Sequence, residues 1–173
     1  MMADSFDMAM LRGGVEDWNI WREQHPITRP NLSQANLYAT NLSGINFDGV
    51  NLYEADLRKA KLIEARMMGA QLIAANLAET NMTKANLTAI NLSEGNLSYA
   101  CLHQVDLTFA DLTNAELRHT DLREADLFEA KLGNANLEGA NLEGANLRRA
   151  KYNHKTVWPD NFNPEDAGAL LVD

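Results

Sequence analysis

A five-residue period dominates this sequence and constrains its fold more than any other feature. It begins at Pro30 and runs without insertion to His154, which makes 25 consecutive units. The middle position is Leu in 21 of the 25 units, and the position two residues earlier is Ala in 16 of them. The position just before the middle is Asn in 13 units and Asp in 5. Every unit therefore combines one large apolar position and one small position with three mostly polar ones.

This period fits neither a helix nor an uninterrupted strand, because those elements repeat about every 3.6 and 2.0 residues. The chain must therefore turn within every unit to keep its apolar positions buried. If each unit forms one short side of a coil, the large and small positions both point inward, and successive coils stack about 4.8 Å apart. Asn, Asp and Gly at the remaining positions suit tight turns. The pattern predicts an all-β fold, a parallel β-solenoid with a core of Leu and Ala columns.

The placement of charges favours four sides per coil over three. Residues one coil apart lie at ladder distance and should prefer opposite signs. Four sides require a spacing of 20 residues, which gives six opposite-charge and two like-charge pairs within 30–154. Three sides require 15, which gives two opposite and four like pairs. The six pairs are Lys59/Glu79, Glu64/Lys84, Asp111/Lys131, Arg118/Glu138, Arg123/Glu143 and Glu129/Arg149. A four-sided solenoid over 30–154 contains about six coils.

The unit, seen as Ala35-Asn36-Leu37 and again at 85–87 and 140–142, resembles the pentapeptide-repeat family. The flanking residues also resemble the ends of stand-alone cyanobacterial members of this family. The resemblance implies a right-handed quadrilateral β-helix, in agreement with the charge spacing. It implies no single function, since most members have none assigned.

Residues 1–29 are expected to form a helical cap on the first coil. A solenoid exposes its core and its unpaired strand edges at both ends, so terminal segments must cover them. Leu11, Val15 and Trp18 recur at helical spacing and predict a helix near 7–24, weakened by a Gly-Gly pair.

Residues 155–173 are expected to cap the other end. Trp158 and Phe162 can cover the last coil, and a proline with an acidic first turn predicts a short α-helix over 164–171. The apolar tail 169–172 would support a homodimer through this terminus if it does not fold back on the last coil.

No motif indicates an enzyme, a metal site or a cofactor. A convex rod with a filled core offers no cleft in which a nucleophile and an acid-base pair could converge. The single Cys101 cannot form an internal disulfide, and no Cys/His cluster has metal-ligand spacing. His103 and His119 occupy outward positions on different predicted sides. We expect a non-enzymatic protein that binds neither cofactor nor metal.

The net charge of −9 disfavours direct binding to nucleic acid or to anionic lipid, because both would be repelled. No stretch approaches the roughly 18 apolar residues of a membrane span. The first residues lack the basic and apolar regions of a secretory signal. These features predict a cytoplasmic protein.

The resemblance suggests one specific function, because some pentapeptide-repeat proteins are quinolone-resistance factors. Their acidic rod resembles DNA and binds a type II topoisomerase (gyrase). Mimicry requires a continuous negative surface, yet each of the four predicted sides sums to −1 over 30–154. The acidic residues between 105 and 129 encircle the rod instead of running along it. DNA mimicry is therefore the alternative hypothesis.

Apolar side chains at outward positions favour a protein-interaction scaffold. Ile63, Met68 and Ile73 follow one another around a single coil, and Phe109 and Phe128 also occupy outward positions. These residues lie on different sides, and scattered exposed apolar groups are ordinary on protein surfaces. The hypothesis is that an unidentified protein partner binds these five residues, with chance exposure as its alternative.

Overall fold

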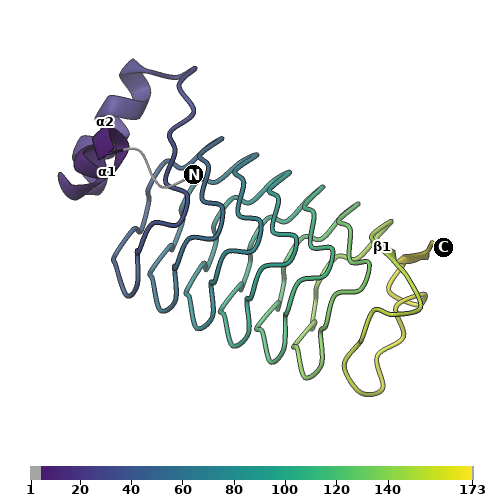
Figure 1. Ribbon diagram of the computed structural model, residues 1–173. Helices are drawn as coiled ribbons and strands as arrows, with labels where there is room; N and C mark the ends of the chain where they lie inside the picture. Colours follow the sequence, from purple (N-terminus) through teal and green to yellow (C-terminus); the bar gives the residue numbers. More distant parts are fainter. Residues whose placement is uncertain (1–4, 173) are drawn as a thin grey trace.

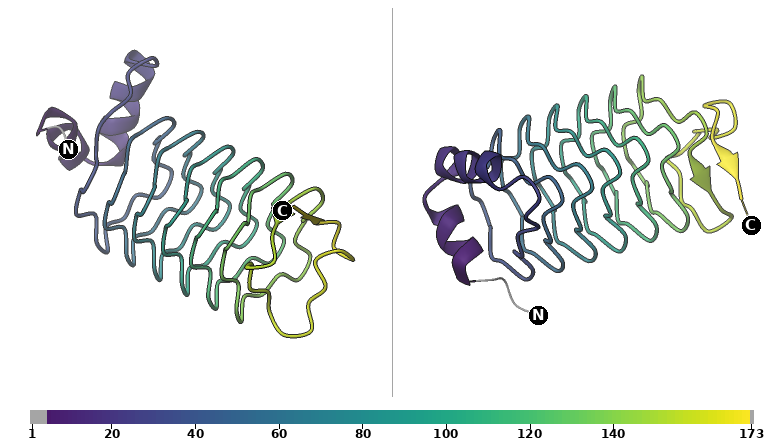
Figure 2. Two further views of the ribbon diagram at one scale, coloured as in Figure 1. Left: turned by 45° about the vertical axis from the view of Figure 1, so that its right-hand side comes forward. Right: turned by 90° about the horizontal axis from the view of Figure 1, so that it is seen from above.

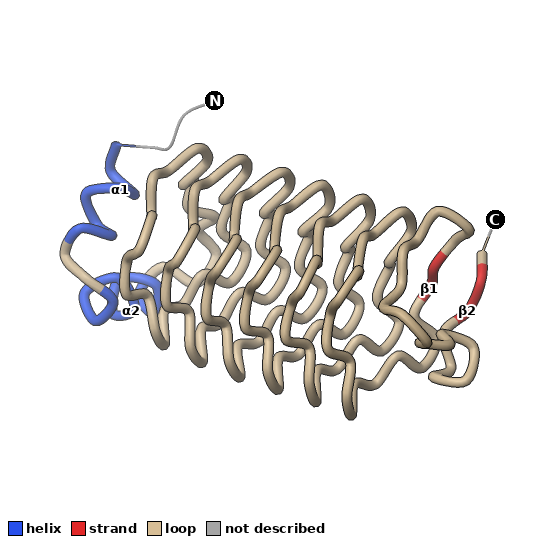
Figure 3. Tube along the Cα trace, turned by 90° about the horizontal axis from the view of Figure 1, so that it is seen from below, coloured by secondary structure: helices blue, strands red, loops and turns tan. Residues whose placement is uncertain are grey.

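The computed structural model describes residues 5–172 as a rod of stacked rectangular coils with two helices at one end (Figure 1). The helices are α1 (Ser5–Arg12) and α2 (Val15–Gln24), and the two short strands are β1 (Lys151–Tyr152) and β2 (Leu170–Leu171). The helices and the two strands lie at opposite ends of the rod (Figures 2 and 3). The predicted right-handed quadrilateral β-helix is confirmed.

Each coil has four sides, because the bridged residues from Asn31 to Lys131 each pair with the residue 20 positions later. Parallel bridges run in unbroken register from Asn31↔Asn51 to Lys131↔Lys151. We number the sides from the start of the repeats: sides 1, 2, 3 and 4 begin at residues 30, 35, 40 and 45, and each recurs every 20 residues. The four-sided prediction from charge spacing is therefore confirmed.

From residue 50 to residue 149, each side makes the same three hydrogen bonds to the coil before it. On side 1, the Asn51 N–H donates to the Pro30 carbonyl at 2.9 Å, while the Asn51 carbonyl accepts from the Leu32 N–H at 2.7 Å. The Tyr53 carbonyl accepts from the Gln34 N–H, also at 2.7 Å. One donor and two acceptors per side thus face the preceding coil.

The corners between sides are tight turns that contain a left-handed residue. The Ala35 N–H donates to the Leu32 carbonyl at 3.1 Å, and Gln34 has φ +59°. A positive φ at the third turn residue alone is the pattern of a type II turn. The same position has a positive φ in all 24 corners from Gln34 to Arg149, and 19 of these residues are not glycine.

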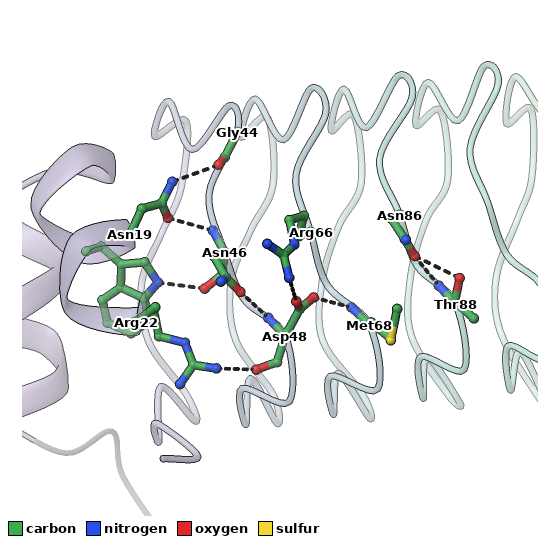
Figure 4. Close-up of polar contacts among 10 residues, drawn as sticks. Asn19, Arg22, Gly44, Asn46, Asp48, Arg66, Met68, Asn86 and Thr88 are labelled. Carbon is green, nitrogen blue, oxygen red and sulfur yellow. Dashed lines mark hydrogen bonds and ion pairs between the residues drawn. The ribbon is translucent and has the colours of Figure 1, made fainter. Parts of the chain in front are cut away.

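The Asn and Asp side chains before the central residue hold the start of each turn. Asn86 Oδ1 accepts hydrogen bonds from the Thr88 N–H at 3.0 Å and from Thr88 Oγ1 at 2.8 Å (Figure 4). This local bond is an Asx-type turn, which explains why the repeat prefers Asn or Asp here. The Leu and Ala columns are buried inside the rod, and each enclosed Leu stabilises the fold by about 2 kcal/mol.

The N-terminal cap is helical as predicted, but the single helix expected over 7–24 is wrong. The chain forms α1 and α2, which are separated at Gly13 and Gly14. Gly14 has φ +100°, a conformation that favours glycine and ends the helical backbone. The break turns α2 so that Trp18 packs edge to face against Phe47, with ring centroids 5.5 Å apart. Trp18 thereby closes the N-terminal end of the core.

The short helix predicted over 164–171 is wrong. Among residues 155–172 the structure has turns and the strand β2, with Gly168 at φ +84°. β2 pairs in parallel with β1, and the Leu170 N–H donates to the Ala150 carbonyl at 2.7 Å. Pairing with the open edge of the last coil outweighs the local helix signal, because it satisfies backbone groups that would otherwise lack partners. The tail thus folds back on the last coil, and homodimerisation through this end stays a prediction.

The aromatic residues of the C-terminal segment lie over the end of the core. Trp158 stacks on Phe162 with ring centroids 5.3 Å apart and meets Tyr152 edge to face at 5.4 Å. Val157 pairs with Asn136, a spacing of 21 residues, so the register shifts by one where the repeats end.

Candidate interaction surfaces

The five outward apolar residues predicted to bind a partner do not form one patch. Ile63 lies on side 3, and Ile73 lies on side 1 of the following coil, while Met68, Phe109 and Phe128 lie on side 4. Met68 is 49% exposed and Phe109 is 52% exposed, whereas the other three are half-buried. Met68 and Ile73 line a common groove, in which Ile63 has no part. Phe109 instead meets Phe128 edge to face, with ring centroids 6.0 Å apart.

Met68 and Ile73 contribute to an open groove of about 830 Å³ along the corner between sides 4 and 1. Gly49 and Gly69 occupy successive positions at this corner, with φ +66° and +64°. A Cβ atom at either glycine would meet nothing within 4 Å. Because these two successive corners carry no side chains, the surface is concave here. We call this feature the corner groove, which is lined by Arg29, Gly49, Asn51, Tyr53, Met68, Gly69, Gln71 and Ile73.

Hydrogen bonds hold the Met68 edge of the corner groove in place. Asp48 Oδ1 accepts from the Met68 N–H at 2.9 Å, and Asp48 Oδ2 forms an ion pair with Arg66 at 2.5 Å (Figure 4). Gln71 Nε2 donates to the Gly69 carbonyl at 3.1 Å on the opposite edge. The hydrogen bond to Asp48 thus fixes the backbone that carries the Met68 side chain.

The groove combines apolar surface with one cationic side chain. Tyr53 adds an aromatic ring to Met68 and Ile73, and Arg29 supplies the charge. A hydrogen bond to Glu54, together with the negative charge of Glu54, raises the pKa of Tyr53 above its usual value. Tyr53 shares the outward repeat position of Ile73, so the repeat pattern could have pointed to it. Arg29 precedes the repeats, and nothing in the pattern signals its role.

Most predicted charge pairs between coils are formed. Four of the six are ion pairs, whereas Glu64/Lys84 and Arg123/Glu143 are not. Arg123 instead pairs with Asp121 of its own unit at 2.8 Å. The four are Lys59–Glu79 at 3.5 Å, Arg118–Glu138 at 2.9 Å, Lys131–Asp111 at 2.9 Å and Arg149–Glu129 at 3.1 Å.

The acidic residues between 105 and 129 are partly neutralised by these contacts. The Arg123 guanidinium hydrogen-bonds to Asp121 and holds the pKa of that carboxyl below its usual value. Burial raises the pKa of Asp111, but hydrogen bonds from Thr113 and Lys131 outweigh this effect and lower it overall. These carboxylates are therefore charged at neutral pH but paired, which weakens the field that they present to solvent.

The remaining polar candidates have structural contacts. Between residues 5 and 172, no group of three or more His, Cys, Asp or Glu side chains could hold a metal ion. His103 Nδ1 lies 3.1 Å from the Arg123 carbonyl, and His119 stacks on Tyr99 with ring centroids 5.0 Å apart. Cys101 Sγ lies 3.3 Å from the Thr83 hydroxyl. Neither described helix is long and apolar enough to cross a membrane.

The repeat region matches the family model of pentapeptide repeats. Eight copies are matched, over residues 31–69, 70–108, 90–127, 106–144 and 125–151. No curated protein matches this chain.

Several solved structures are similar to this chain. The pentapeptide repeat protein alr5209 from Nostoc PCC 7120 is 40% identical over 62% of this chain and 84% of its own, with a TM-score of 0.33. A pentapeptide repeat protein of the Arabidopsis thaliana thylakoid lumen is 28% identical over 68% of each chain, with a TM-score of 0.28. QnrB1, a plasmid-mediated fluoroquinolone resistance protein, is 12% identical over 83% of each chain, with a TM-score of 0.51. The likeness to QnrB1 shows a shared fold alone, and the cytoplasmic location stays a prediction.

Proposed function

Since the chain belongs to the pentapeptide-repeat family, we propose that it is a non-enzymatic scaffold that binds a protein partner through the corner groove. The observation that carries this proposal is the convergence of Met68 and Ile73 on a hollow of about 830 Å³. Apolar side chains beside a concave surface accept a protruding partner side chain, which is the usual arrangement of an interface hot spot.

The lining of the groove favours a partner that presents an apolar side chain next to an acidic group. Tyr53 and Met68 offer apolar surface, and Arg29 can pair with a carboxylate. The amides of Asn51 and Gln71 can hydrogen-bond to the backbone of the partner. Aromatic, Met and Arg side chains are the residues enriched in protein interfaces.

The topoisomerase alternative has weaker support. Each side carries a net charge of −1 over residues 30–154, and acidic residues such as Asp111 and Asp121 are ion-paired. DNA mimicry would need unpaired negative charge that continues along one side of the rod.

Photo-crosslinking from the corner groove tests the scaffold proposal. A photoreactive amino acid at Ile73 should crosslink one specific protein in lysate of the source organism, and the purified partner can then be titrated by calorimetry. We expect Met68→Lys to weaken binding by about 2 kcal/mol, because a charge replaces a hot-spot side chain.

Tyr99→Lys is the matched control, because Tyr99 is 64% exposed and lies on side 2, outside the corner groove. It should bind the partner as tightly as the wild type does. Equal affinity of the wild type and Met68→Lys would overturn the proposal, as would the absence of a specific crosslinked protein.

A further inference from the structure

The N-terminal cap replaces a missing coil on side 4. The first coil has no coil before it, so its donors and acceptors on that edge need other partners. Asn19 Oδ1 accepts from the Asn46 N–H at 2.8 Å, and Trp18 Nε1 donates to the Asn46 carbonyl at 2.8 Å (Figure 4). Arg22 donates to the Asp48 carbonyl at 2.7 Å. Side chains of α2 thus make the bonds that backbone groups make elsewhere in the rod.

The cap bonds side 3 at its corner, where Asn19 Nδ2 donates to the Gly44 carbonyl at 3.0 Å, but it leaves the edge groups of sides 2 and 3 of the first coil without such partners. On side 1, Asp7 Oδ2 accepts from the Asn31 N–H at 2.7 Å. On sides 2 and 3, two N–H donors and four carbonyl acceptors face away from the rod with no hydrogen-bond partner among residues 5–172. They are the N–H groups of Asn36 and Asn41 and the carbonyls of Asn36, Tyr38, Asn41 and Ser43. Half of the first coil therefore presents an open β edge.

A groove of about 370 Å³ lies beside this open edge. Leu37 and Leu42 line it and are each 4% exposed, whereas Leu57 and Leu62, one coil later, are 0% exposed. The side chains of Leu37 and Leu42 are thus partly exposed, whereas the equivalent leucines of the second coil are completely covered. We call this feature the edge groove, which is lined by Met8, Leu11, Arg12, Gly14, Val15, Asn36, Leu37, Thr40, Asn41 and Leu42.

We propose that an extended segment of a protein partner adds to sides 2 and 3 of the first coil by β-strand addition. An open strand edge is a template for an additional strand, which gains affinity from backbone hydrogen bonds and specificity from side-chain pockets. The site is separate from the corner groove and does not depend on the function proposed for it.

The bonds between coils define what the added segment must offer. Side 1 of the first coil presents the Pro30 carbonyl and then the N–H groups of Leu32 and Gln34 to the second coil. The partner must present the same order to each open side: a carbonyl, then N–H groups two and four residues later. Its residue equivalent to Leu32 points toward the core and should be large and apolar, because Met8 and Leu37 line the groove there.

Arg12 adds a preference for acidic residues in the segment. It is the charged residue of the edge groove, it is exposed, and it forms no ion pair with any residue between 5 and 172. An added strand with a net negative charge would pair with it.

Amide hydrogen exchange of the free protein tests the open edge. The amides of Asn36 and Asn41 should exchange at least about 100-fold faster than those of Asp56 and Lys61, which occupy the same positions one coil later and donate to carbonyls. The Asn46 amide, which donates to Asn19, should exchange as slowly as that of Asp56. Equal protection of Asn36, Asn41, Asp56 and Lys61 would overturn the proposal.

A peptide probe tests strand addition itself. The probe is a capped ten-residue peptide with the sequence of residues 115–124, which forms sides 2 and 3 of a later coil and carries a net charge of −1. Titration followed by NMR should shift the Asn36 and Asn41 amides and slow their exchange. Methylation of the peptide nitrogen at the Leu117 position should weaken binding about tenfold, because it removes a ladder donor.

Methylation at the Arg118 position is the matched control, because the Arg118 N–H makes no bond between coils. Met8→Lys should weaken binding about tenfold, whereas Ile20→Lys, on an exposed part of α2, and Met68→Lys should leave it unchanged. The proposal fails if the peptide does not bind, or if both methylated peptides bind equally well. It also fails if the peptide binds to Met68 instead of the edge groove.

Discussion

Replacing the corner alanines with glycine should stabilise this protein, the reverse of the usual effect of an Ala→Gly change. Ala39, Ala74 and Ala89 have φ values of +54°, +56° and +54°. The left-handed conformation costs an L-residue about 1–2 kcal/mol, whereas glycine loses about 0.5–1 kcal/mol through its greater freedom in the unfolded chain. At the midpoints of these ranges the net gain is about 0.75 kcal/mol per site.

The three gains should add, because the alanines lie at corners of different sides, Ala39 on side 2, Ala74 on side 1 and Ala89 on side 4, and their methyl groups are outside the core. The triple variant should then be about 2 kcal/mol more stable than the wild type. Urea unfolding followed by far-ultraviolet circular dichroism measures this difference through the transition midpoint. We expect the midpoint to rise while the slope of the transition stays the same.

Ala85→Gly is the control for this experiment, because Ala85 is 1% exposed and its φ is not positive. It should destabilise the rod by about 1 kcal/mol or more, since it removes a buried methyl group and adds chain freedom. A triple variant that is no more stable than the wild type would refute the assignment of strain to the corners.

The other predictions concern the cap, pH and the topoisomerase. Arg22 donates hydrogen bonds to two backbone carbonyls at 2.6 and 2.7 Å. Arg22→Met should therefore lower the free energy of unfolding by about 2 kcal/mol, whereas Arg12→Met should leave it unchanged. Equal effects of the two substitutions would contradict the capping role of Arg22. Arg123 lowers the pKa of Asp121, so the ionised carboxyl stabilises the protein fully above its unfolded-state pKa of about 3.9, and this stabilisation is lost as the pH falls through the folded-state pKa. Asp121→Asn should therefore reduce the loss of stability in acid. An unchanged dependence of stability on pH, measured by urea unfolding, would argue against this role. DNA supercoiling by gyrase should proceed equally with and without the protein, and inhibition would support DNA mimicry.

The repeat region was predictable because one local rule recurs in every unit. Leu37, Ala55 and Asn86 occupy repeat positions whose burial or turn contact follows from a five-residue pattern. Charge spacing then selected four sides, since pairs such as Lys131–Asp111 need to lie one coil apart. A single unusual unit cannot change the coil, because its neighbours impose the same register from both directions.

The candidate surfaces were only partly predictable. Met68 and Ile73 were identified as outward residues, but the pattern could not show that Gly49 and Gly69 hollow the corner beside them. Phe109 was grouped with them in the sequence and lies outside the corner groove. Adjacency around a corner depends on the side chains of two successive coils, which a linear pattern does not reveal.

The sequence alone determined the coil: its four sides, its buried columns and its polar turns all follow from residues that repeat. Only the tertiary structure decided the ends, where α1 and α2 replace the expected single helix and β2 replaces a predicted helix. The physical reason is that a terminal segment occurs once and must satisfy whatever backbone groups the coil next to it leaves unpaired. At the first coil that requirement is met on two sides, and the open edge at Asn36 and Asn41 is what remains.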